Sequence, residues 1–97
     1  EQYKGAQVFY AAKSEDSKRL GDTIQESLKE IIADGNTRNA KEIDRNVLIL
    51  KDVDIPSVIV ECGFLSNPEE AALLQENNYR QKLAWGIYLG IVRYFNR

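Results

Sequence analysis

The chain has 97 residues and a formal net charge of -2, with 43% hydrophobic and 29% charged residues. This composition is typical of one folded domain or a part of one, and it indicates neither a disordered chain nor a membrane protein. The 13 basic residues are scattered among 15 acidic ones, so no basic stripe predicts a nucleic-acid interface. No apolar run approaches the ~20 residues that a membrane-spanning helix needs.

Histidine is absent, and Cys62 is the single cysteine. The chain alone therefore cannot build a Ser-His or Cys-His nucleophile pair. It also cannot build a disulfide framework or a cysteine-based zinc site. Methionine is absent too, and the first residues are polar and unlike a signal peptide. We therefore expect a piece of a longer chain, in which another part supplies any metal ligands.

The first third of the chain predicts a strand followed by a helix. Residues 5–10 alternate and contain aromatic and branched side chains, as strands do. Ser14 or Asp16 can cap a helix, and Gly35 can end it in the left-handed conformation. Between these positions, apolar residues recur at spacings of three and four, which predicts an amphipathic helix; they are Leu20, Ile24, Leu28, Ile31 and Ile32.

A polar segment and two strands are expected next. Residues 36–45 show no period and predict a loop. Its Arg38, Lys41 and Arg45 either contact an anionic ligand or are solvated, as loop residues usually are. Residues 46–50 and 57–61 are the predicted strands, since a proline such as Pro56 is tolerated at a strand start. The unbroken apolar run at 58–60 predicts burial on both faces of the sheet.

Two helices are predicted to close the chain. Asn67 can cap the first, Pro68 suits its first position, and Glu70 suits a capping box. This helix is expected to end near Gln75, with a break at 77–78. The last helix is expected to dock on the sheet through a wide apolar stripe, formed by Leu83, Ile87, Ile91 and Phe95 with Ala84, Tyr88 and Val92 beside them.

The predicted order of elements indicates an α/β fold with three layers, in which helices flank a sheet. About three strands and three helices are expected within the chain. Because a typical sheet has ~5–6 strands, we expect further strands in the rest of the domain, upstream of residue 1.

Glu61 is the candidate catalytic residue, since it ends a strand just before Gly63, where the chain can turn with a positive φ. Ligands of open α/β sheets bind beyond the carboxyl ends of strands, where a carboxylate on a rigid element can act as a general base or acid. The alternative is a solvated glutamate or a helix cap. Cys62 is interpreted as a small buried hydrophobe, Ser66 as part of the helix entry, and Trp85 as a core residue.

Residues 55–67, Ile-Pro-Ser-Val-Ile-Val-Glu-Cys-Gly-Phe-Leu-Ser-Asn, resemble the C-terminal signature of the zinc-dependent N-acetylmuramoyl-L-alanine amidases, the amidase type 3 family. Residues 68–70, 73–74 and 79–84 fit the same pattern, and 5–10 resemble the family strand that follows the last zinc histidine. Residues 36–38 and 46–48 are similar to its spore-cortex, CwlD-like branch. The resemblance covers essentially the whole chain.

The resemblance implies that residues 1–97 are the C-terminal portion of one amidase domain. The two His and one Glu that bind zinc in the family would lie in the absent N-terminal half, so this chain is expected to hold no metal ligand. Glu61 matches the catalytic glutamate of the family. It would act as general base and acid for a zinc-activated water, which cleaves the amide between N-acetylmuramic acid and L-alanine. Lys51 stands where many members have Arg, and it lacks the planar guanidinium.

The same resemblance implies peptidoglycan as substrate and an extracytoplasmic location, in the forespore intermembrane space of a spore former. Muramic-lactam formation in the spore cortex would be its process. It also implies a lipoprotein as a possible partner. The missing half or a second copy is expected as well, because an exposed sheet edge invites pairing. The fragment alone is expected to be inactive. The alternative function is a non-catalytic peptidoglycan-binding or regulatory module of the same fold.

Overall fold

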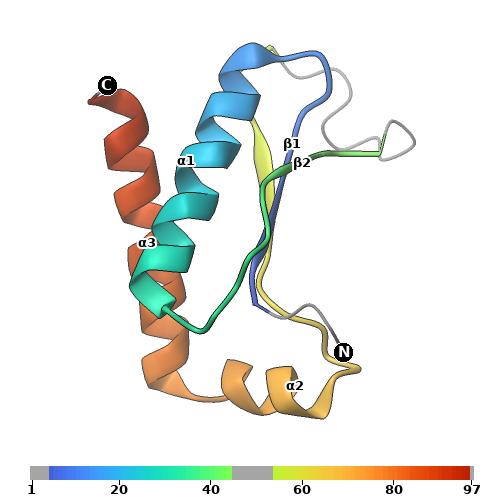
Figure 1. Ribbon diagram of the computed structural model, residues 1–97, viewed down its shortest axis with the longest axis vertical. Coiled ribbons are helices and arrows are strands. Elements are labelled where there is room, and N and C mark those ends of the chain that lie inside the picture. The colour runs from blue at the N-terminus through green and yellow to red at the C-terminus, as the bar shows by residue number, and fades with distance from the viewer. Residues whose placement is uncertain (1–4, 45–53, 97) are drawn as a thin grey trace.

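The computed structural model describes residues 5–44 and 54–96. In this part of the chain, strands and helices follow one another in the order β1 (Gln7–Tyr10), α1 (Glu15–Ile32), β2 (Lys41–Glu42), β3 (Val58–Glu61), α2 (Pro68–Leu74) and α3 (Asn77–Phe95). Figure 1 shows α1 and α3 side by side to the left of the strands, with α2 across the lower end. The predicted α/β class is confirmed.

The sheet has the strand order β2-β1-β3 among the described residues. β1 pairs in parallel with β2 and antiparallel with β3, so the sheet is mixed. The prediction of a loop throughout 36–45 was wrong, because Lys41 and Glu42 form β2. Both residues are exposed and polar, so no apolar pattern marks a strand that depends on pairing with the edge of β1. The strand predicted at 46–50 lies outside the described residues.

Helix α1 is capped at both ends, by a side chain at its start and by the backbone at its end. The Ser17 amide donates to Oγ of Ser14 over 3.1 Å, which confirms Ser14 as the N-cap. At the other end Ala33, and not the predicted Gly35, adopts the left-handed cap conformation, and its N–H donates to the Lys29 carbonyl. Gly35 also has a positive φ of 83°, so it turns the chain two residues beyond the cap.

The core lies between α1, α3 and one face of the sheet. Its buried cluster consists of Ala6, Val8, Ile24, Leu28 and Leu83. The predicted stripe of α1 is confirmed, since Ile24 and Leu28 are each only 1% exposed. β3 differs from the prediction of burial on both faces, because all four of its residues are half-buried.

Helix α3 packs closely on α1 through two glycines. A Cβ built on Gly86 would lie 2.7 Å from Cδ2 of Leu28, and one on Gly90 would lie 2.7 Å from Cα of Ile24. The hydroxyl of Ser27 donates to the Gly86 carbonyl over 2.7 Å. The absence of side chains at these two positions is therefore what lets the two helix backbones approach.

The apolar stripe predicted for α3 was only partly right. The buried residues of α3 are Leu83, Gly86, Gly90 and Tyr94, whereas Ile91 and Phe95 are exposed. The glycine contact with α1 rotates the helix so that its small residues face inward. The predicted break at 77–78 was also misplaced, because α3 begins at Asn77.

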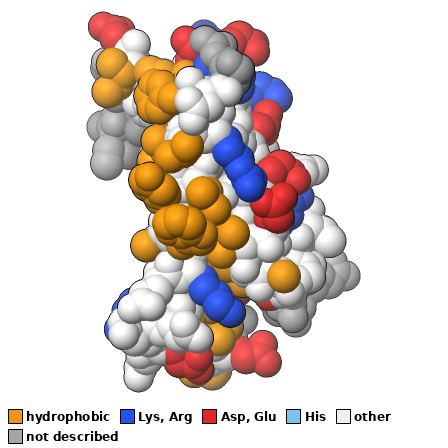
Figure 2. Space-filling view, turned by 90° about the vertical axis from the view of Figure 1, so that its left-hand side faces the viewer, with side chains coloured by type: hydrophobic (Ala, Val, Ile, Leu, Met, Phe, Trp, Pro, Cys, Tyr) orange, Lys and Arg blue, Asp and Glu red, His pale blue; other side chains and the backbone are white. Residues whose placement is uncertain are grey.

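The outward side of α3 carries a row of large apolar side chains, here called the α3 apolar face. Figure 2 shows hydrophobic side chains gathered along this side of the molecule. The row consists of Trp85, Tyr88, Ile91 and Phe95, which are 39–74% exposed, so the interpretation of Trp85 as a core residue was wrong. The rings of Trp85 and Tyr88 stack with their centroids 5.5 Å apart. Among the residues that the structure describes, none of the helices combines the length and the hydropathy of a membrane span.

We predict that Gly90→Ala lowers the free energy of unfolding by about 1–2 kcal/mol, because overpacking against backbone outweighs the gain in helix propensity. Gly86→Ala is the matched comparison, since its nearest neighbour is the movable end of the Leu28 side chain. We expect a smaller loss for it. Urea unfolding of the two variants would measure both values, and equal stability of the two variants and the parent chain would contradict the close approach.

Candidate active site at the end of β3

Glu61 is the last residue of β3 and lies on the sheet face turned away from α1. Val58, Val60 and Cys62 pack against the core, and side chains of a strand alternate between the two faces. Ile59 and Glu61 therefore point to the opposite face. Because β3 runs antiparallel to β1, Glu61 pairs with Gln7. It thus lies at the carboxyl end of β3 but beside the start of β1. In an all-parallel sheet, the carboxyl ends of both strands would lie at the same edge.

The Glu61 carboxylate is not used to hold the described structure together. None of the side-chain hydrogen bonds and ion pairs found between residues of 5–44 and 54–96 involves it. The residue is half-buried, and the helix that follows is capped by Asn67 instead. Within the described part of the chain, Glu61 is therefore neither locked into the interior nor a helix cap.

A tight turn follows Glu61 and redirects the chain into α2. Gly63 has a φ of 156°, and a Cβ there would lie 3.4 Å from Cδ1 of Leu74 and 3.5 Å from Cβ of Glu70. The prediction that Gly63 serves a positive φ or a close approach is confirmed. The Asn67 side chain accepts from the amides of Glu69 and Glu70, which confirms the predicted N-cap of α2.

Cys62 has the surroundings of an unreactive thiol. Burial raises its pKa above the usual 9.0, and the neighbouring negative charge of Glu61 raises it further. A raised pKa leaves less thiolate at neutral pH, and the thiolate is the nucleophile. The structure therefore supports the interpretation of Cys62 as a small hydrophobe at the border of the core.

Two basic residues of the segment 36–45, Arg38 and Lys41, line one pocket together with Gln7, Thr37 and Asn39. Nη1 of Arg38 donates to Oε1 of Gln7 over 3.2 Å, so Arg38 lies beside the residue that pairs with Glu61. Lys41 belongs to β2. Arg45 and Lys51 lie outside the described residues. Arg38 is thus a structural neighbour of the candidate site through Gln7.

Glu70 has other hydrogen-bond donors than the sequence pattern predicted. Its carboxylate does not bond the Asn67 amide as in a capping box, because that amide donates to the Phe64 carbonyl. Instead Oε1 accepts from the Phe64 amide over 2.8 Å, and Oε2 accepts from the Gly5 amide over 3.1 Å. A glutamate at the third helical position is the usual capping-box signal, so the sequence gives no sign of these distant partners.

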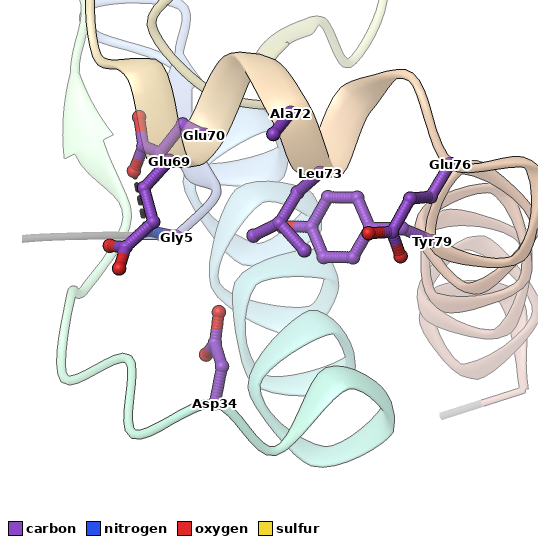
Figure 3. A pocket seen from close by; sticks show the side chains of 8 residues that line it. All are labelled: Gly5, Asp34, Glu69, Glu70, Ala72, Leu73, Glu76 and Tyr79. Carbon is purple, nitrogen blue, oxygen red and sulfur yellow. Dashed lines mark hydrogen bonds between the residues drawn. The ribbon is translucent and has the colours of Figure 1, made fainter.

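A pocket of about 430 Å³ opens beside Glu70, and Figure 3 shows Gly5 and Glu70 joined across one side of it. Its lining consists of Gly5, Asp34, Glu69, Glu70, Ala72, Leu73, Glu76 and Tyr79. Burial raises the pKa of Tyr79, and the charges of Asp34 and Glu70 add to the effect. Glu61 is not among the residues that line this pocket.

The side chains present do not make a metal site by themselves. Across residues 5–44 and 54–96, no group of three Asp, Glu or Cys side chains is placed to hold a metal ion, and the chain has no histidine. The residues of these two ranges therefore do not fit a complete zinc site.

Comparison with known proteins identifies the family. The model of the N-acetylmuramoyl-L-alanine amidase family matches residues 1–93, and the chain belongs to this family. The germination-specific N-acetylmuramoyl-L-alanine amidase of Bacillus subtilis strain 168 is 39% identical over 95 residues, which are 98% of this chain and 39% of that protein. The resemblance seen in residues 55–67 is thereby confirmed.

Solved amidase structures share the fold. The CwlD amidase of Clostridioides difficile, solved in complex with the GerS lipoprotein, is 47% identical with a TM-score of 0.91, over 98% of this chain and 48% of that one. An N-acetylmuramoyl-L-alanine amidase of Clostridium difficile 630 is 28% identical with a TM-score of 0.82, over 98% and 50% of the two chains. The chain thus spans about half the length of these solved relatives.

We predict that iodoacetamide labels Cys62 at pH 8 at least several-fold more slowly than it labels the same chain unfolded in urea. Burial lowers access to the thiol, and the raised pKa lowers the thiolate fraction. Mass spectrometry of timed samples would give both rates. Equal labelling rates in the folded and the unfolded chain would contradict the inert interpretation.

Proposed function

We propose that these residues are the C-terminal portion of one amidase catalytic domain, and that Glu61 is its general base and acid. The substrate is peptidoglycan, and the bond cleaved is the amide between the lactyl group of N-acetylmuramic acid and L-alanine. The observation that carries the proposal is a carboxylate without a structural partner among the described residues, at the end of a strand. A general base must reach the proton that it abstracts from a fixed position.

Glu61 acts in two steps of the proposed hydrolysis. Its carboxylate first accepts a proton from the water whose oxygen attacks the amide carbon. The carbon–nitrogen bond then breaks, and Glu61 returns the proton to the departing amine of L-alanine. The products are the free lactyl carboxylate and the stem peptide with a free amino terminus.

Zinc enters this proposal with ligands from outside the 97 residues, because the described residues place no three metal-ligating side chains together. When bound, a zinc ion supplies Lewis-acid chemistry and lowers the pKa of a coordinated water. The isolated chain is therefore expected to be inactive, and activity to belong to the complete amidase.

We further propose that the amidase acts outside the cytoplasm, in the forespore intermembrane space. Its substrate there is spore cortex peptidoglycan, and its process is muramic-lactam formation. Support comes from the germination-specific relative of Bacillus subtilis. The CwlD relative was solved with a lipoprotein, so we propose a lipoprotein as a protein partner here too. A cortex lacking muramic-lactam in a strain deleted for the gene would support this role, and an unchanged cortex would oppose it.

We predict that Glu61→Gln in the complete amidase lowers kcat by about 10²–10⁴-fold, because the amide cannot accept the water proton. Release of soluble fragments from purified peptidoglycan would measure the rate. Glu69→Gln is the matched control, since Glu69 is an exposed carboxylate in the first turn of α2, and we expect it to keep full activity. Undiminished activity of Glu61→Gln would refute the assigned role.

The α3 apolar face is proposed to pack against the part of the amidase that lies outside these 97 residues. Exposed apolar patches of this kind mark contact surfaces, and the chain covers only about half of its solved relatives.

We predict that residues 1–97 alone self-associate in sedimentation experiments. Replacing both Trp85 and Ile91 by Lys should restore a monomer, whereas a well-folded monomer of the unchanged chain would count against the proposal.

A further inference from the structure

We propose that Glu70 is a positioning residue that fixes the place of the Glu61 carboxylate by tying the turn after β3 to the segment before β1. The inference rests on the proposed catalytic role of Glu61. It gives a task to a buried carboxylate that the hydrolysis itself does not use.

The contacts of Glu70 join two segments that are far apart in the sequence. Its oxygens accept from the Phe64 amide over 2.8 Å and from the Gly5 amide over 3.1 Å. Phe64 is three residues beyond Glu61, and Gly5 is two residues before Gln7, the residue that pairs with Glu61. One side chain thus holds together the two strands at the end of the ladder where the candidate catalytic residue lies.

The surroundings of Glu70 strengthen its hydrogen bonds to the two amides. The residue is only 8% exposed, and hydrogen bonds from amides to an ionised carboxylate are shorter and stronger than those between neutral groups. On the far side, Gly5 has a φ of 93°, and a Cβ there would lie 2.6 Å from Nδ2 of Asn36. A side chain at position 5 would therefore displace the amide that Glu70 binds.

The same geometry explains why the tie matters for a reaction at Glu61. A general base works only within hydrogen-bond reach of the proton, and a misplacement of about 1 Å can cost on the order of 10²-fold in rate. Within the described residues, the carboxylate of Glu61 has no side-chain or backbone partner of its own. Its position is thus set by the backbone on either side, and Glu70 holds that backbone beyond residue 61.

The test compares four variants of the complete amidase: Glu70→Ala, Glu70→Gln, Glu69→Ala and Glu61→Gln. Glu70→Ala removes both hydrogen bonds, and we expect kcat to fall about 10–100-fold with little change in KM. Glu70→Gln keeps one amide oxygen as acceptor, so we expect kcat to recover part of this loss. Glu69→Ala, on the exposed side of the same turn, should resemble the parent enzyme.

Hydrogen exchange of individual amides provides a readout that does not depend on activity. In Glu70→Ala we expect faster exchange at Gly5 and Phe64, while the amide of Ile59, which pairs with Phe9 in the β1–β3 ladder, keeps its protection. If Glu70→Ala fails to fold, Glu70→Gln serves in its place, with a smaller effect expected at the same two amides.

The outcomes separate this inference from the proposed function. Undiminished activity of Glu61→Gln would overturn the catalytic role of Glu61, and with it the positioning role of Glu70. Faster exchange at Gly5 and Phe64 in Glu70→Ala would then still establish the two hydrogen bonds. If Glu61→Gln is inactive but the Glu70 variants keep kcat within twofold of the parent, the positioning role is wrong. Unchanged exchange at Gly5 and Phe64 would show that the tie itself does not form.

Discussion

The antiparallel pairing of β1 with β3 is the interaction on which the candidate site depends. It aligns Gln7 with Glu61 and Val8 with Val60, so that one face of the ladder enters the core while Glu61 points to the other. A shift of the register by one residue would exchange the two faces, which would bury the carboxylate and expose Val60. The zero exposure of Val8 and its contact with α1 oppose such a shift. Packing of the core therefore also determines which way Glu61 points.

Features governed by local chemistry could be predicted from the sequence. Ser14 and Asn67 cap their helices as expected, because a cap needs only a side-chain oxygen and amides two or three residues away. The stripe of α1 was predicted because its apolar residues recur with the helical period. The signature of residues 55–67 indicated both the family and the candidate catalytic residue, whose role remains a prediction.

Features governed by distant partners could not be predicted in this way. β2 has exposed polar residues, and its pairing depends on the edge of β1. The inward side of α3 contains Gly86 and Gly90, which carry no hydrophobic signal although they make the closest approach to α1. Glu70 has the spacing of a capping box, yet its partners are Gly5 and Phe64. In each case the deciding neighbour lies far away in the sequence, where periodicity gives no information.

The stacked pair on α3 also provides an optical label. Trp85 is the single tryptophan of the chain, and it is 52% exposed beside the ring of Tyr88. Its fluorescence spectrum therefore depends on the polarity around one helix surface alone, without interference from a second indole. Within these 97 residues, a change in emission wavelength reports directly whether water or another polypeptide lies against α3, and it does so without any added dye.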